Sequence, residues 1–229
     1  MQPDPATAND QLGATRVVLR PIASPFPLGF AGLAAASVIM AGTELGWIRH
    51  SDYAHAGLIV FIVAPLLQVI ACVFGFLSRD AVAATGMGVL AATWAGIGAV
   101  TVTSRAGATS HALGTLLLLA GAAILVSATV AATAKLVPAI VMGLSAARFV
   151  VTGIYEFVPD SGWKTASGIV GLVVALAALY GMASLEIESM RGSPLLPTLR
   201  RGPGRQALAG DLPSQVSGVA AEAGVRKQL

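Results

Sequence analysis

Apolar residues fill six long runs of this chain, and short polar segments separate each run from the next. We place the runs at residues 28–48, 53–77, 81–104, 111–133, 136–157 and 165–186. A helix of about 20 apolar residues crosses the hydrocarbon core of a bilayer, and each run reaches that length. The pattern therefore predicts an all-α integral membrane protein with six transmembrane helices.

The polar links between the runs hold only a few residues each. They are Arg49–Asp52, Ser78–Asp80, Arg105–Ser110, Ala134–Lys135 and Val158–Lys164. Because short links join sequential helices as antiparallel neighbours, we expect one six-helix transmembrane domain over residues 24–186. Residues 1–23 are expected to form a cytoplasmic N-terminal tail, and residues 187–229 a disordered, basic, cytoplasmic C-terminal tail.

Composition supports a membrane protein and argues against other classes. Only 11% of the residues are charged and 55% are hydrophobic, whereas soluble domains carry about 25% charged residues. The net charge of +3 comes mostly from cations in the tails and links. We attribute it to membrane topology and to contact with anionic lipid rather than to nucleic acid. Cys72 is the only cysteine, which excludes a disulfide within the chain.

Lysine and arginine are unevenly divided between the two sides of the predicted membrane. The side that holds both tails receives ten of them, the opposite side receives three, and Arg148 lies inside a run. Positively charged segments are retained on the cytoplasmic side of membranes. We therefore expect a multi-pass protein of the cell (inner) membrane with both termini in the cytoplasm.

The run 136–157 carries a polar stripe along one helical face. The stripe is made of Ser145, Arg148, Thr152, Tyr155 and Glu156. Such a face must contact protein or water, because lipid cannot satisfy it. Arg148 lies near the middle of the run, where a charge is costly. Two interpretations stay open: Arg148 lines a solute pathway, or it is a structural cation that pairs with Glu44 or Glu156 or extends toward the membrane surface.

Gln68 is the strongly polar side chain in the middle of the run 53–77, and it follows Pro65. Proline inside a helix frees a backbone carbonyl and kinks the chain. Gln68 either forms a hydrogen bond to a neighbouring helix or binds a carboxylate or amide in transit. On the run 28–48, Leu33, Ser37 and Glu44 lie on one face.

The sequence offers no set of residues for covalent or metal chemistry. Gly143–Ala146 loosely resembles the serine segment of an intramembrane protease, but no histidine follows on a later run to act as its base. His50, Asp52 and His55 lack the spacing of a strong metal motif. The chain also has no phosphate-binding or dinucleotide-binding loop. We expect neither an enzyme nor a cofactor.

The segment Ser24–Phe30 reads Ser-Pro-Phe-Pro-Leu-Gly-Phe. It resembles the Asn-Pro-Ala-Pro-Leu-Gly-Leu motif that opens the first helix of the acetate uptake transporter family, typified by the bacterial succinate–acetate permease. Gln68 and Trp94 match a glutamine and a tryptophan of that family. The Gly-x-x-Gly and Ala-x-Tyr motifs of its last helix are matched by Gly168, Gly171, Ala178 and Tyr180. The resemblance covers residues 24–186 and excludes both tails.

The resemblance implies six helices per protomer, a homohexamer, and a separate solute pathway through each protomer. It also implies a channel or proton-linked carrier for small monocarboxylates such as acetate, and in some members succinate. The apolar neck of the family uses a phenylalanine, a tyrosine and a leucine, which align with Leu33, Leu90 and Leu144. The expected pathway residues are Ser24, Pro25, Pro27, Leu28, Gly29, Leu33, Ser37, Gln68, Leu90, Leu144 and Arg148.

Four positions depart from the family pattern. Ser24 lacks the amide of the family asparagine, Leu33 and Leu90 replace aromatic residues, and Arg148 has no assigned counterpart. These departures bear on the identity of the solute. Two alternatives are therefore kept: an amide or urea channel of similar six-helix build, and a membrane scaffold or sensor that transports nothing.

Overall fold

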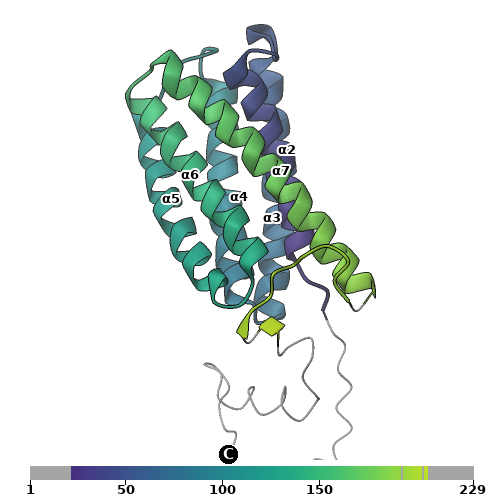
Figure 1. Ribbon diagram of the computed structural model, residues 1–229. Helices are drawn as coiled ribbons and strands as arrows, with labels where there is room; N and C mark the ends of the chain where they lie inside the picture. Colours follow the sequence, from purple (N-terminus) through teal and green to yellow (C-terminus); the bar gives the residue numbers. More distant parts are fainter. Residues whose placement is uncertain (1–21, 192, 203, 206–229) are drawn as a thin grey trace, which may run out of the picture.

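The computed structural model describes residues 22–191, 193–202 and 204–205. Most of the expected N-terminal tail and the far part of the expected C-terminal tail lie outside these residues. Six long helices account for most of the described chain (Figure 1). They are α2 (Phe26–Leu45), α3 (Tyr53–Leu77), α4 (Ala81–Thr103), α5 (His111–Ala132), α6 (Leu136–Phe157) and α7 (Ser161–Arg191), and a 3-10 turn, η1 (His50–Asp52), precedes α3.

All six helices are long and apolar enough to cross a membrane. Their outward faces carry large apolar side chains, most densely on α3 and α5. Examples are Leu58, Ile62, Leu66, Val69 and Val73 on α3, and Leu119 and Val126 on α5. Continuous exposed apolar surface of this kind fits hydrocarbon rather than water. The chain is therefore an all-α, multi-pass membrane protein, as the hydrophobic pattern predicted.

The six helices form a closed ring. Each helix packs mainly against the helices that precede and follow it, and α7 closes the ring by packing against α2. Consecutive helices run in opposite directions, so the bundle has two ends (Figure 1). We call the end where α2 begins and α7 finishes the proximal end, and the end with the α2–α3, α4–α5 and α6–α7 links the distal end. Buried residues of all six helices form one interior core.

Local sequence signals fix both ends of α2. Pro27 lies in the first turn, where the missing N–H of proline costs no hydrogen bond. Gly46 ends the helix in a left-handed conformation (φ 87°), and its N–H donates to the carbonyl of Gly42 at 3.1 Å. The helix therefore ends at Leu45, one residue after Glu44, which fixes this carboxyl group near the distal end.

The last helix is longer than the apolar run at 165–186. It begins at Ser161 and continues to Arg191, so residue 187, where we expected the tail to start, lies inside α7. Beyond α7 the chain turns back toward the bundle. Arg200 binds Glu188 through two parallel bonds, Nε to Oε1 and Nη2 to Oε2, both 2.8 Å long. This ion pair ties the polar end of α7 to the segment that turns back.

Candidate functional site

A pocket with a volume of about 80 Å³ lies in the distal half of the bundle. All six helices and the α4–α5 link contribute to its wall. The apolar part of the wall includes Met40, Trp94, Ile97, Leu113 and Phe149. The ionisable part consists of Glu44, Arg105, Arg148, Glu156 and Lys164, together with Tyr53 and Tyr155. Such a volume accommodates a few waters or one small solute.

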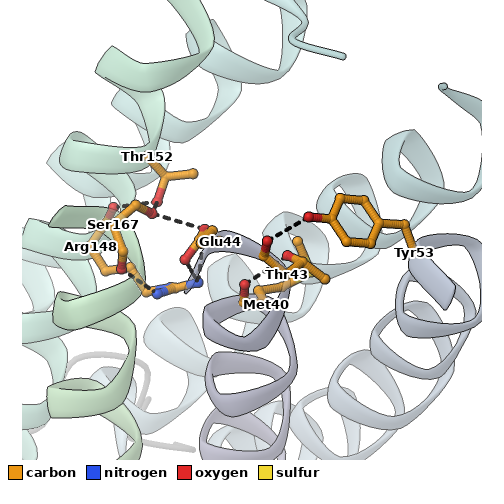
Figure 2. Close-up of polar contacts among 7 residues, drawn as sticks. All are labelled: Met40, Thr43, Glu44, Tyr53, Arg148, Thr152 and Ser167. Carbon is orange, nitrogen blue, oxygen red and sulfur yellow. Dashed lines mark hydrogen bonds and ion pairs between the residues drawn. The ribbon is translucent and has the colours of Figure 1, made fainter. Parts of the chain in front are cut away.

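Glu44 and Arg148 form an ion pair in the wall of this pocket (Figure 2). Nη2 of Arg148 donates to both carboxylate oxygens of Glu44, at 3.3 and 3.2 Å. The side chains of Arg148 and Glu44 are only 2% and 8% exposed. An isolated charge at this depth of a membrane protein is costly, and each member of the pair compensates for the other.

Ser167 on α7 binds both members of the pair. Its backbone carbonyl accepts a hydrogen bond from Nη1 of Arg148 at 2.8 Å, and its hydroxyl donates to Oε1 of Glu44 at 2.9 Å. The hydroxyl of Thr152 lies 2.6 Å from Oγ of Ser167 (Figure 2). We call Glu44, Arg148, Thr152 and Ser167 the distal cluster. It connects α2, α6 and α7 through polar contacts.

Tyr53 holds the end of α2 beside this cluster. Its hydroxyl donates to the carbonyl of Thr43 at 2.6 Å, and the hydroxyl of Thr43 donates to the carbonyl of Met40 at 2.8 Å (Figure 2). Carbonyls in the last turn of a helix lack donors within the helix, so Tyr53 satisfies one of them. The contact fixes the turn that carries Glu44.

Two glycines allow α7 to pass close to the pair. A Cβ atom at Gly171 would overlap Nη1 of Arg148, and one at Gly168 would overlap the side chain of Leu45. These are the two glycines that matched the Gly-x-x-Gly motif in the sequence. In this fold they make room for a guanidinium group and for the end of α2.

Gly171→Ala is expected to lower the melting temperature of the protein in detergent, because the added methyl group displaces Arg148 or pushes α7 away. Overpacking of this kind costs about 1–3 kcal/mol. Gly143→Ala on α6 is the matched control, since its Cβ would meet nothing within 4 Å. Alanine there gains about 0.5–1 kcal/mol over glycine in a helix. Equal melting temperatures for the two variants would contradict the close approach at Gly171.

Glu156, the other carboxylate expected as a partner for Arg148, binds a different residue. It is buried, and its Oε2 accepts a hydrogen bond from the backbone N–H of Ser110 at 2.6 Å. Oγ of Ser110 in turn accepts from the N–H of Leu113 at 3.3 Å and caps α5. Glu156 therefore ties α6 to the start of α5.

Three fully buried side chains carry polar atoms without a hydrogen-bond partner. Within the part of the chain that the structure describes, these atoms are Oγ of Ser37, Oε1 and Nε2 of Gln68, and Nε1 of Trp94. A buried polar group without a partner costs about 1–3 kcal/mol. Native proteins keep such groups where water, an ion or a ligand satisfies them. The three residues come from α2, α3 and α4, and they are candidates for contact with a solute inside the ring.

The three leucines expected at the neck differ in burial. Leu33 and Leu90 are fully buried in the interior core, whereas Leu144 is half-buried at the edge of that core. On α6, Met142 and Phe149 are the large side chains that are fully buried.

The residues of the expected entrance lie at the proximal end. Ser24 and Leu28 are exposed, Pro27 is half-buried, and Pro25 and Gly29 are buried. Ser24 and Pro25 line a surface hollow with Asp80, Lys135 and Arg200. Lys135 forms an ion pair with Asp80, and its ammonium group lies 5.4 Å from the centre of the Phe26 ring.

Sequence reasoning missed Ser167, Tyr53 and Phe149 as parts of the site. The ring of Phe149 packs edge-on against Trp94, with centroids 5.7 Å apart, and Cζ of Arg148 lies 5.8 Å from the centre of the Trp94 ring. The sequence did hold a signal for Ser167: this residue lies four positions before Gly171 and therefore on the same helical face.

Among the described residues, no group of three or more metal-binding side chains lies together.

Comparison with known proteins finds a solved structure with a similar fold. No family model matches the sequence, and no curated protein matches it. Among solved structures, "Structure of the bacterial acetate channel SatP" is similar, with a TM-score of 0.68 over 77% of this chain and 99% of that chain, at 17% sequence identity. The six-helix fold of this protein is therefore similar to the fold of a membrane channel. At the level of the fold, this confirms the resemblance to the acetate permease type that Ser24–Phe30 suggested.

Proposed function

We propose that this protein transports small monocarboxylates, with acetate as the representative solute, along a pathway through the interior of its six-helix ring. The proposal rests on the buried, unpartnered amide group of Gln68. Its amide is fully buried on a membrane helix, and both of its polar atoms lack a partner. An amide donates hydrogen bonds to a carboxylate through Nε2 and accepts one from a carboxylic acid through Oε1. The similar fold of the acetate channel supports the same solute class.

The proposed pathway runs from the proximal hollow to the distal pocket. The solute would enter beside Ser24 and Pro25 and pass the segment from Pro27 to Gly29. It would then cross an apolar neck at Leu33, Leu90 and Leu144. Ser37 and Gln68 would satisfy its polar atoms within the ring, and Arg148 would meet it in the distal pocket.

The residues of this pathway favour different forms of the solute. An apolar neck passes a neutral acid more readily than an anion, whereas a buried arginine attracts the anion. An apolar neck followed by a buried arginine is compatible with a proton-linked carrier, and also with a channel that passes both the neutral acid and the anion. The same proposal includes a homohexamer in the cell (inner) membrane with both termini in the cytoplasm, as expected from the family resemblance and the charge distribution.

Counterflow of labelled acetate into proteoliposomes at neutral pH tests the proposed function. Protein-free liposomes supply the background, because acetic acid itself crosses lipid. We expect counterflow above that background and block of this excess by propionate. Flux that equals the background would refute carboxylate transport.

Gln68 also favours one second candidate, a channel for neutral amides or urea. Its carbonyl and amide groups pair with those of acetamide as well as with a carboxyl group. Competition separates the two candidates. Excess acetamide that blocks solute flux where acetate does not would favour the amide channel.

A further inference from the structure

We infer that Arg148 is an exchangeable anion site, at which the carboxylate of a free solute replaces the carboxylate of Glu44. Glu44 is then a tethered occupant of the site that competes with the solute. The inference rests on the proposed function only for the identity of the solute as a small carboxylate. Its structural basis is the geometry of the distal cluster.

Two arginine–glutamate ion pairs among the described residues differ in geometry. In the pair at the proximal end, Arg200 offers Nε and Nη2 to separate oxygens of Glu188, each at 2.8 Å. In the distal pair, a single nitrogen of Arg148 serves both oxygens of Glu44, at 3.2 and 3.3 Å. Parallel bonds from a guanidinium fork are the strong arrangement for this kind of pair. Glu44 therefore holds Arg148 more weakly than Glu188 holds Arg200. The distal pair does not use the arrangement in which two guanidinium nitrogens each bind one carboxylate oxygen.

The surroundings of Arg148 suit a free anion. The pocket at the pair is also lined by Arg105 of the α4–α5 link and by Lys164 in the first turn of α7. Together with Arg148 they outnumber the two carboxylates of the pocket, Glu44 and Glu156. An excess of cations attracts an anion toward a cleft with low-dielectric walls. Trp94 lines the same pocket, and its indole N–H is buried without an acceptor among the described residues. A carboxylate that reached this N–H would supply the missing acceptor.

Exchange at this site keeps Arg148 paired with a carboxylate, and Glu44 gives up its two bonds from Arg148 to the solute. When a solute carboxylate accepts the bonds of Arg148 Nη2, Glu44 is released from the guanidinium but keeps its bond from the Ser167 hydroxyl. Arg148 keeps its bond to the Ser167 carbonyl, so the cation is not left free. Ser167 thus holds both groups in place while the anion on Arg148 changes. When the solute leaves, Glu44 returns and neutralises the cation.

A binding measurement tests the exchange without transport. Trp47→Phe and Trp163→Phe leave Trp94 as the only tryptophan of the chain. Its fluorescence in detergent is titrated with sodium acetate against sodium chloride at constant ionic strength. In this background we expect Glu44→Gln to bind acetate at least about tenfold more tightly, since relief of competition worth about 1.4 kcal/mol gives that factor. Arg148→Gln should abolish the saturable signal.

Glu156→Gln is the matched control, because it removes a second buried carboxylate of the same pocket that bonds to Ser110 instead of Arg148. It should tighten acetate binding clearly less than Glu44→Gln does. Equal effects of the two substitutions, or an unchanged affinity in Glu44→Gln, would overturn the exchange.

Glu44→Ala keeps the inference testable if Glu44→Gln does not fold. The heavy atoms that this substitution removes, Cγ and the carboxylate group, are those of an acetate ion. Acetate should therefore raise the melting temperature of Glu44→Ala, and should raise it less in Glu44→Ala/Arg148→Met or when chloride replaces it. Equal shifts in the single and double variants would overturn the inference.

Acetate counterflow with the same proteins separates the two proposals. Counterflow together with no tightening in Glu44→Gln would overturn the exchange and leave transport standing. Tightening without any counterflow would support the anion site and refute the proposed function.

Discussion

Arg148→Met is expected to destabilise the protein by about 3–5 kcal/mol, because it leaves the Glu44 carboxylate buried without its cation. Glu44 is 8% exposed, and its other partner is the hydroxyl of Ser167. One neutral hydrogen bond does not compensate for the loss of water around a carboxylate. The variant should therefore show a large drop in melting temperature when it is purified in detergent.

The double variant Arg148→Met/Glu44→Gln should recover most of that loss. A buried ion pair is often no more stabilising than a well-packed neutral pair, whereas a single buried charge is always costly. Comparison of both single variants with the double variant gives the coupling between the two residues. If the double variant were as unstable as the two single variants combined, the ion pair would not explain the loss.

Gln68→Met is expected to stabilise the protein and to slow carboxylate transport. Removal of two unpartnered polar atoms from the core should gain about 1–3 kcal/mol. Loss of a hydrogen bond to a carboxylate, worth about 1.5–3 kcal/mol, should slow passage at least about tenfold. The melting temperature and the rate of acetate counterflow measure the two effects on the same preparation.

Thr93→Val is the control for Gln68→Met. Thr93 is equally buried, but its hydroxyl donates to the carbonyl of Val89 at 2.7 Å. The substitution should therefore give no gain in melting temperature and should leave acetate flux above that of Gln68→Met. If Gln68→Met lowered the melting temperature and left acetate flux unchanged, the amide of Gln68 would serve a structural contact and its role in the pathway would be refuted.

The fold was predictable from the sequence because a bilayer imposes a simple rule. Each apolar run of sufficient length becomes a helix, and α2 to α6 begin and end close to the runs. The same rule failed for α7, whose last turn is polar, because hydropathy does not mark a polar stretch as helix. Glu188 lies in that extension, and its partner Arg200 is what the hydropathy pattern could not reveal.

The site was predictable only in part. The polar stripe on α6 correctly places Ser145, Arg148 and Glu156 on a buried face. The choice of Glu44 rather than Glu156 as the partner of Arg148 depends on where α2 ends and on how close α7 approaches. Ser167 illustrates the limit, because a small polar residue in an apolar helix gives no sign of its long-range partner. Only the packing of α2, α6 and α7 brings its hydroxyl to Glu44.

One measurement tests most directly whether a solute pathway runs through the ring, because the chain has a single cysteine. Cys72→Ser provides a cysteine-free background, into which Ser37→Cys or Ser184→Cys is introduced. Both serines are fully buried, but only the hydroxyl of Ser184 has a partner, the carbonyl of Gly181 at 3.2 Å. Acetate counterflow is then followed in proteoliposomes after treatment with a small, negatively charged thiol reagent.

We predict that the reagent blocks counterflow through Ser37→Cys, that acetate slows this block, and that Ser184→Cys is unaffected. Equal sensitivity of the two variants, or transport by Ser37→Cys that the reagent leaves unchanged, would contradict a pathway past Ser37 and Gln68.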